Sequence, residues 1–436
     1  MQHTLHPSTN RSLTKELREQ DMNRVTQRER GRRGRPSSGD PAWLAVLCLS
    51  LMLGACDLAV ELPGDITAEE LEQPEDLPLL VTSAEGVFEC AYQQYVLLSA
   101  QLIDEFMSGG SDGAYYIYDQ REITPATGTY SSGGCPGGQL AGLYTPLSQA
   151  RWFTDSNLQR AQEEGSQGMV ARSAVLAGYA YTLFGEGFCS AAYDGGPEVF
   201  PPQSLELAED RFSTAISSGS GDLQTLAYLG RARVRLNQGD MAGAISDAQQ
   251  VPDGFAYYAT RSSADNSRQN HLYGSNWIDR NIEVDVPFWN LEFEGVPDPR
   301  VELIHTGNTG RNGLNPEVLQ TKYPDYDADI PIGRYAEALL IIAEAAGGQT
   351  AVDNINELHS RAGLPLFASD DPAEIMAQVY EERRRELFIE GHRMNDMLRL
   401  NIPFPSGADQ FNDRRYGETT CFPLPDIERE NNENIP

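Results

Sequence analysis

The chain has almost no lysine. Lys15 and Lys322 are the only two lysines among 436 residues, and only Lys322 lies beyond the N-terminal segment. Schiff-base catalysis needs a lysine nucleophile, and Walker-type nucleotide binding needs one after a glycine-rich phosphate loop, which is also missing. These two classes of enzyme are therefore disfavoured from the outset.

Metal-site spacing is also missing. There is no CxxC pair, and the four histidines beyond the leader lie far apart without HExxH spacing: His271, His305, His359 and His392. Asp325, Asp327 and Asp329 alternate like the start of a calcium loop. However, Ile330 replaces the glycine at its sharp turn and Ala336 replaces the closing glutamate. We therefore expect neither a metal nor a cofactor.

Positive charge is scarce. The formal net charge is −31. Residues 1–55 hold 9 basic and 5 acidic side chains, which leaves 24 basic against 59 acidic ones afterwards, or −35. Such a balance argues against nucleic acid and against electrostatic docking to anionic lipid. It favours neutral or cationic ligands over acidic polysaccharides.

The N-terminus has the pattern of an export signal. Residues 1–40 are basic and polar, and Ala42 to Leu53 are apolar except for Ser50. Twelve residues are too few to span a bilayer but suit a signal peptide, although a short buried helix is the alternative. The sequence Leu53-Gly54-Ala55-Cys56 resembles a lipobox. We expect residues 1–55 to be a signal peptide, starting at Met1 or Met22, and Cys56 to carry lipid.

An acidic, proline-bearing stretch follows the lipobox, and we interpret residues 56–80 as a tether. Cys48 would leave with the signal. Four cysteines then remain, which could form two disulfides in three connectivities or stay as buried thiols: Cys90, Cys135, Cys189 and Cys421.

Helical periodicity dominates residues 81–436. Helices are predicted over 82–107, 143–162, 169–184, 205–217, 223–237, 241–250, 334–346, 352–362 and 374–400. The helical pair at 223–250 looks like one tetratricopeptide repeat, with Gly239-Asp240 as its turn. Two stretches, 108–138 and 252–331, read as long loops rich in glycine and aromatic residues. Long loops in compact domains are often functional.

The last third of the chain contains several motifs that resemble those of a known family. Its motifs are Arg334 to Ile341, Asn356 to Leu364, Glu382 to Leu387 with Glu390 to Arg393, and Phe422 to Pro425. In this order they resemble the SusD/RagB family of lipid-anchored, outer-membrane nutrient-binding proteins. The resemblance implies a mostly α SusD-like fold in which tetratricopeptide-like helix pairs carry irregular, ligand-facing loops. Residues 331–436 would be its family-motif region.

The same resemblance implies the function. The protein would be a non-catalytic lipoprotein of the outer membrane that faces the cell surface and binds oligosaccharides or peptides. It would deliver them to a SusC-like, TonB-dependent transporter. The ligand and the face of the outer membrane remain open. A tetratricopeptide adaptor that binds protein, and a secreted glycoside hydrolase, are the two alternatives.

The charges between residues 382 and 396 bear on the hydrolase alternative. Glu386 and Glu390 lie one helical turn apart, as a pair of catalytic carboxylates could. Neighbouring arginines would keep them ionised, whereas a general acid needs a raised pKa. We therefore expect a structural ion-pair network, made of Glu382, Arg383, Glu386, Glu390, Arg393 and Asp396.

Aromatic residues in the two loop stretches are the candidate ligand contacts. Tyrosine and tryptophan offer a flat apolar face with a polar edge, which suits sugar rings and peptide side chains. Core packing is the alternative for each of them. The candidates are Tyr115, Tyr116 and Tyr118 in the early stretch, with Trp277 and Trp289 in the middle one.

Overall fold

The structure, a computed structural model, describes residues 76–110, 113–134 and 142–435. These residues belong to one unit, Ile66–Pro436. The predicted signal peptide, the lipidated Cys56 and most of the tether lie outside them. Within these ranges no helix is both long enough and apolar enough to cross a membrane.

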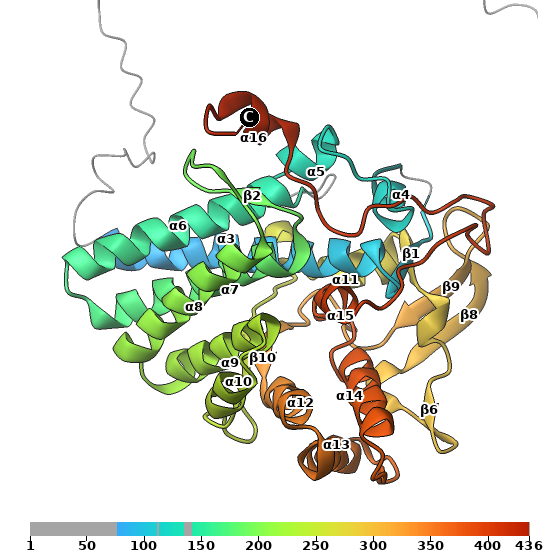
Figure 1. The fold of residues 1–436 in the computed structure, drawn as a ribbon. Coiled ribbons are helices and arrows are strands. Elements are labelled where there is room, and N and C mark those ends of the chain that lie inside the picture. Colours follow the sequence, from blue (N-terminus) through green and yellow to red (C-terminus); the bar gives the residue numbers. More distant parts are fainter. Residues whose placement is uncertain (1–75, 111–112, 135–141, 436) are drawn as a thin grey trace, which may run out of the picture. The chain divides into compact units, whose positions relative to one another are not determined.

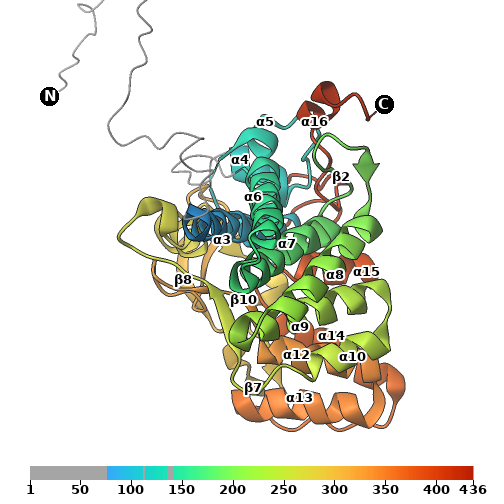
Figure 2. The ribbon, with the colours of Figure 1, turned by 90° about the vertical axis from the view of Figure 1, so that its left-hand side faces the viewer.

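A stack of helices forms the larger part of the unit (Figure 1). The central helix α3 is buried along most of its length and packs against α6 and α7. From there each helix packs on the next, through α8, α9 and α10 to α12, α13 and α14, as Figure 2 also shows. The bounds are α3 Leu77–Leu102, α6 Tyr144–Glu163, α7 Gln167–Gly187, α8 Pro201–Ser218, α9 Gly221–Gln238, α10 Met241–Ala248, α12 Tyr335–Ala346, α13 Gly348–Ala362 and α14 Pro372–Glu386. The mostly helical fold class is confirmed.

Small residues set the spacing within the stack. The ring of Phe212 on α8 lies against Gly178 of α7 and Gly230 of α9. A β-carbon at Gly230 would come within 2.3 Å of that ring, so only glycine fits there. The predicted repeat at 223–250 is the hairpin of α9 and α10, and Gly239 turns it with a φ of 84°.

Short strands and helical turns form the rest of the unit (Figure 1). The strands of the described residues pair antiparallel in two-stranded sheets. The pairs are β1 Phe106–Ser108 with β5 Ile282–Val284, β2 Ala191–Ala192 with β3 Glu198–Val199, β4 Ala256–Ala259 with β10 Ile330–Arg334, β6 Glu292–Phe293 with β7 Val296–Pro297, and β8 Leu303–Thr309 with β9 Pro316–Gln320. The helical pieces are α4 Gly113–Asp119, α5 Gly128–Ser132, η3 Asn266–Arg268, α11 His271–Tyr273, η4 Gly274–Ile278, η5 Val286–Phe288, η6 Pro299–Val301, α15 Arg393–Arg399 and α16 Asp426–Asn431.

Three sequence predictions of secondary structure need correction. The first helix ends at Leu102, and Phe106–Ser108 forms a strand because it pairs with β5. The stretch 108–138 is not all loop, since α4 and α5 lie in it. The helix predicted over 374–400 is broken into α14 and α15.

Contacts from distant parts of the chain explain this break. Ile389 has a φ of 48° and its backbone N–H donates to the Glu105 carboxylate at 2.7 Å. The ammonium of Lys322 donates to the carbonyl of Phe388 at 2.7 Å and to the Glu390 carboxylate. Carbonyl and N–H groups that a continuous helix would use internally are therefore satisfied from outside.

The predicted charged residues of this region each have an ion-pair partner. Glu382 pairs with Arg300 and His359, Glu386 with Arg334 and Arg300, and Glu390 with Lys322 and Arg334. Arg383 pairs with Asp396 and Glu344, and Arg393 with Asp104. The partners come from α12, α13, β10 and the loops, so the pairs connect α14 and α15 to most of the unit.

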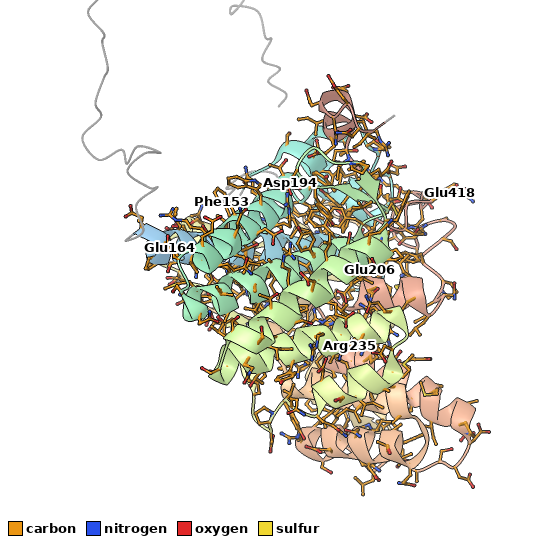
Figure 3. The ribbon with its side chains drawn as sticks, turned by 60° about the vertical axis from the view of Figure 1, so that its left-hand side comes forward. Phe153, Glu164, Asp194, Glu206, Arg235 and Glu418 are labelled. Atoms are coloured by element: carbon orange, nitrogen blue, oxygen red, sulfur yellow. A yellow bond between two sulfur atoms is a disulfide. The ribbon has the colours of Figure 1, made fainter. Side chains whose placement is uncertain are left out.

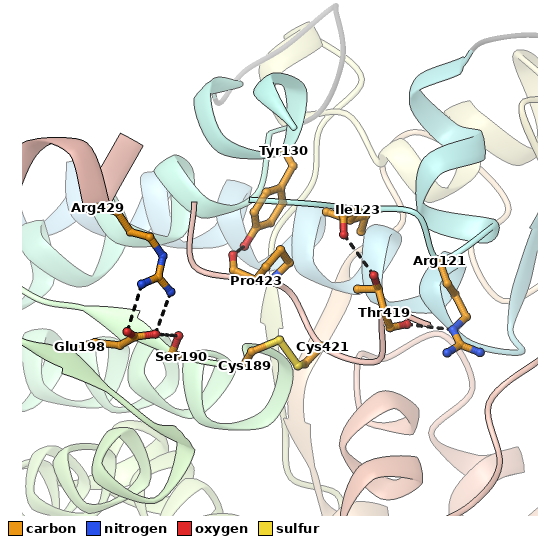
Figure 4. Close-up of a disulfide and its surroundings, with 10 residues drawn as sticks. All are labelled: Arg121, Ile123, Tyr130, Cys189, Ser190, Glu198, Thr419, Cys421, Pro423 and Arg429. Carbon is orange, nitrogen blue, oxygen red and sulfur yellow. Dashed lines mark hydrogen bonds and ion pairs between the residues drawn. A yellow bond between two sulfur atoms is a disulfide. The ribbon is translucent and has the colours of Figure 1, made fainter. Parts of the chain in front are cut away.

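A disulfide, a hydrogen bond and an ion pair hold the C-terminal segment against the rest of the unit (Figure 4). A disulfide joins Cys189 to Cys421. Beside it the Tyr130 hydroxyl donates to the carbonyl of Pro423 at 2.6 Å, and Arg429 pairs with Glu198 at 3.0 Å. Cys90 is also disulfide-bonded, and Cys135 lies outside the described residues.

Candidate functional site

Strand pairing brings together the two predicted loop stretches, 108–138 and 252–331. We call the surface that they form the loop face. Strand β1 pairs with β5 over three residues, Phe106 facing Val284 and Ser108 facing Ile282. The hydroxyl of Tyr115 on α4 lies 3.3 Å from that of Ser275 in the helical turn η4. The two regions that the sequence singled out, far apart along the chain, are therefore neighbours in space.

The three tyrosines of α4 lie at different depths. Tyr115 is partly buried. Tyr116 is 8% exposed, with the Arg414 guanidinium 3.7 Å from its ring centre. Tyr118 is 2% exposed and packs edge-on against Phe422, so its ring belongs to the core rather than to the accessible surface.

Trp277 belongs to a small aromatic group on the loop face. Its indole N–H donates to the carbonyl of Gln320 on β9 at 2.7 Å, which fixes the ring. The ring lies 5.9 Å from that of Tyr273, and Tyr273 in turn contacts Tyr326 edge-on at 5.0 Å. All three rings are partly exposed, so they offer flat apolar area with polar edges.

Trp289 is held in a similar way, by a carbonyl of strand β5. Its N–H donates to the carbonyl of Val284 at 2.8 Å, and its ring meets His305 of β8 edge-on at 5.1 Å. Phe411 from the C-terminal part stacks on it at 6.2 Å. Gln320 and His305 belong to the paired strands β9 and β8, so both tryptophans contact one hairpin.

A hollow of about 310 Å³ opens beside Trp289. Its lining combines apolar and hydrogen-bonding side chains, among them Asn290, Leu291, Asp298, Val301, Glu302 and His305. This volume lies at the small end of the range for ligand pockets, roughly 300–1,000 Å³. Sequence reasoning missed Tyr273, His305 and Phe411, because only their contacts with the two tryptophans mark them.

Buried carboxylates fasten the backbone beneath the loop face. Burial raises the pKa of Glu283 to about 8, although its carboxylate accepts the Val318 N–H at 2.8 Å. Burial likewise raises the pKa of Asp119 to about 7, and that group accepts the Ser108 N–H at 2.9 Å. A β-carbon at Gly109 would approach the Glu283 side chain to 2.6 Å, so a larger residue there would have to displace this buried carboxyl group.

The carboxylates that could suggest a hydrolase have a different environment. Burial alone would raise the pKa of Glu386, but the guanidinium groups of Arg334 and Arg300 bring it below its ordinary value. Glu386 is therefore ionised at neutral pH and has no proton to donate, whereas a general acid must be protonated before it acts. Glu390 is only 3% exposed and pairs with Lys322 and Arg334.

The three alternating aspartates bind backbone and side-chain donors. Asp327 accepts from Ser263, Asp329 accepts the Arg261 N–H at 2.6 Å, and Asp325 accepts the N–H of Asp327. Among the described residues no group of three or more carboxylate, histidine or cysteine side chains could hold a metal ion.

Part of the chain matches a known family, and its fold matches solved structures. Residues 311–434 match the SusD family. No curated protein matches the chain at significant similarity. A SusD superfamily protein from Bacteroides vulgatus has the same fold, with a TM-score of 0.63 at 15% identity, over 84% of this chain and 98% of that one.

Two further structures are described by what they bind. A SusD-like carbohydrate binding protein from Bacteroides vulgatus matches with a TM-score of 0.62 at 14% identity, over 83% of this chain and 97% of its own. A laminarin binding SusD-like protein matches with a TM-score of 0.59 at 16% identity, over 82% and 98%. The C-terminal part of the chain thus matches the SusD family, and its described residues have the fold of SusD-like proteins.

Proposed function

We propose that the protein binds oligosaccharides or peptides on the loop face and delivers them to a SusC-like, TonB-dependent outer-membrane transporter without chemical change. The observation that carries the proposal is the pair of tryptophans that contact the β8–β9 hairpin, Trp277 from η4 and Trp289 after η5. Each indole N–H is already bound to a backbone carbonyl, so the rings are fixed and only their faces remain for a ligand. Fixed aromatic faces bind with little loss of side-chain entropy.

Lipid on Cys56 and the acidic tether would keep the binding domain close to the transporter. Tethering raises the effective concentration of the domain at its partner without any new contact. In this proposal the anchor lies in the outer membrane, at the cell surface. Support comes from the lipobox pattern in the sequence and from the match of residues 311–434 to the SusD family.

The binding step is tested with single variants against the best ligand from panels of oligosaccharides and peptides. Trp277→Ala and Trp289→Ala should each weaken binding by roughly tenfold, because a stacked aromatic ring contributes about 0.5–1.5 kcal/mol beyond the area that it buries. Tyr228→Ala is the matched control, since Tyr228 is a partly exposed aromatic on α9 in the helical stack. Equal affinity in all three variants would contradict a site on the loop face.

Delivery requires a separate experiment. The full chain, carrying an affinity tag at its C-terminus, is isolated from solubilised outer membranes of its own cell. We expect a TonB-dependent barrel protein to co-purify, and Cys56→Ser to reduce its yield because the anchor is lost. Isolation of a soluble periplasmic partner in place of a barrel would favour the adaptor.

The adaptor alternative has one structural observation in its favour. Besides the hairpin of α9 and α10, the pairs α6 with α7, α8 with α9 and α12 with α13 also pack on each other. A stack of helix pairs is the scaffold on which such adaptors bind peptides. Binding of peptides that is insensitive to both tryptophan variants would support it.

A further inference from the structure

A second hollow lies on the helical side of the unit, remote in sequence from the loop-face residues. Its volume is about 470 Å³, and α6, α8 and the turn after β2 form its walls. Figure 3 shows this side, with Phe153 on α6 and Asp194 labelled. The volume falls within the usual range for ligand pockets, roughly 300–1,000 Å³.

Ion pairs hold the polar walls of this hollow in place. Arg151 donates two hydrogen bonds to Asp194, at 2.7 and 2.8 Å, and lies over the ring of Tyr193 at 5.3 Å. Arg211 donates to Asp155 at 2.7 Å, and the Tyr181 hydroxyl donates to the same carboxylate at 2.6 Å. Because their positions are fixed before any ligand arrives, these groups lose little entropy on binding.

An exposed aromatic pair lies at the edge of the hollow. Trp152 lines it and is 50% exposed, and its ring contacts that of Phe153, 39% exposed, at 5.2 Å. Within the described residues the Trp152 indole N–H makes no hydrogen bond, in contrast to those of Trp277 and Trp289. Trp152 therefore offers both an apolar face and a hydrogen-bond donor to an incoming molecule.

The composition of the walls indicates the class of ligand. A protein-docking site has an apolar centre, whereas here carboxylate, guanidinium and amide groups predominate around one aromatic face. Sugar rings present C–H groups on one side and hydroxyls at the edge, which matches this combination. The charged residues of the lining are Asp155, Asp194 and Asp210 with Arg151 and Arg211. Their net charge of −1 disfavours acidic saccharides.

We propose that this hollow is a second carbohydrate site, which binds neutral sugar units of an oligosaccharide with one ring stacked on Trp152. The proposal goes beyond the loop-face function and does not depend on it. Two sites on different sides of one domain would let it hold a long or branched glycan at two points, which strengthens retention through effective concentration.

Tryptophan is rare enough to report on each site separately. The full chain has only Trp43, Trp152, Trp277 and Trp289. Trp43 lies in the predicted signal peptide and would leave with it. Labelled with 5-fluorotryptophan, the lipoprotein should give one ¹⁹F resonance for each remaining tryptophan, assigned with single Trp→Phe variants. The probes are neutral hexasaccharides of α-1,4-glucan, β-1,3-glucan and β-1,4-mannan, at millimolar concentration in a detergent without a sugar headgroup.

We expect the Trp152 resonance to shift saturably with at least one probe. Arg211→Met should weaken that response by roughly tenfold or more, because a hydrogen bond to a charged group is worth about 1.5–3 kcal/mol. Gln159→Ala, an exposed change in the lining that leaves the core intact, should weaken it several-fold. Neither variant should alter the response of Trp277.

Three results would overturn the proposal. A Trp152 resonance that stays still while Trp277 or Trp289 responds would refute the second site and leave the loop-face function standing. Silence of all the resonances would refute both saccharide sites. A Trp152 response to an acidic hexagalacturonate or to peptides, with none to the neutral probes, would refute the assigned ligand class.

Discussion

Replacement of Lys322 by methionine tests whether the broken helix between α14 and α15 is held by the ion-pair network. Methionine keeps most of the length of the side chain but removes the ammonium. That ammonium binds the Glu390 carboxylate and the carbonyls of Phe388, at 2.7 Å, and Glu386, at 3.5 Å. In a continuous helix the carbonyls of Glu386 and Phe388 would accept from backbone N–H groups further along the chain, and at the break the ammonium takes the place of those donors.

The expected cost follows from what the change leaves behind. Glu390 is 3% exposed and would keep only Arg334 as a cationic partner. Removing one partner of a buried ion pair typically costs about 3–5 kcal/mol, because the remaining charge stays buried. We expect Lys322→Met to lower the free energy of unfolding by about this amount.

Urea unfolding, followed by circular dichroism, measures this free energy. Arg361→Met is the matched control, since Arg361 pairs with Asp253 and Glu357 at the surface with 45% of its side chain exposed. Surface pairs contribute about 0–1 kcal/mol, so the control should change little. The double variant Lys322→Met/Glu390→Gln should recover part of the loss. A cost for Lys322→Met no larger than that of the control would refute the reasoning.

Three further predictions concern stability. Burial raises the pKa of Glu105 and of Glu283 to about 8, so the folded protein binds more protons than the unfolded chain between the ordinary value, near 4.5, and pH 8. Stability should therefore fall as pH rises through this window. Thermal unfolding at a series of pH values measures this, and a melting temperature that rises from pH 5 to pH 8 would contradict the prediction. The double variant Cys189→Ala/Cys421→Ala opens a loop of 232 residues. Chain entropy then predicts that the free energy of unfolding, measured with urea, falls by about 5 kcal/mol. An unchanged urea midpoint would contradict this explanation. Glu105→Gln should flatten the upper part of the pH profile, and an unchanged profile would exclude Glu105 as a source of it.

Local sequence patterns predicted the helical stack well. Periodicity placed α6, α7 and α9 within a few residues of their bounds, and Gly239 marked the turn of the repeat. These features depend on neighbours along the chain, which a sequence shows directly. The family motifs likewise lie in contiguous segments, and the SusD match covers the same part of the chain.

Long-range contacts explain what the sequence did not predict. The break after Glu386 depends on Lys322 and Glu105, which lie far away in the sequence. The depth of Tyr118 depends on Phe422, which the C-terminal segment brings back across the helices. The neighbourhood of Trp289 depends on His305 and Phe411 in the same way. No local pattern distinguishes a tyrosine in the core from one at the surface.

The central claim is binding without catalysis, and calorimetric titration with product analysis tests it most directly. The protein is titrated with panels of neutral oligosaccharides and of peptides, and each mixture is then examined for cleavage. The account predicts saturable heat with at least one ligand, recovered intact after prolonged incubation. Cleavage products that disappear in a Glu386→Gln variant would contradict it and would identify a hydrolase.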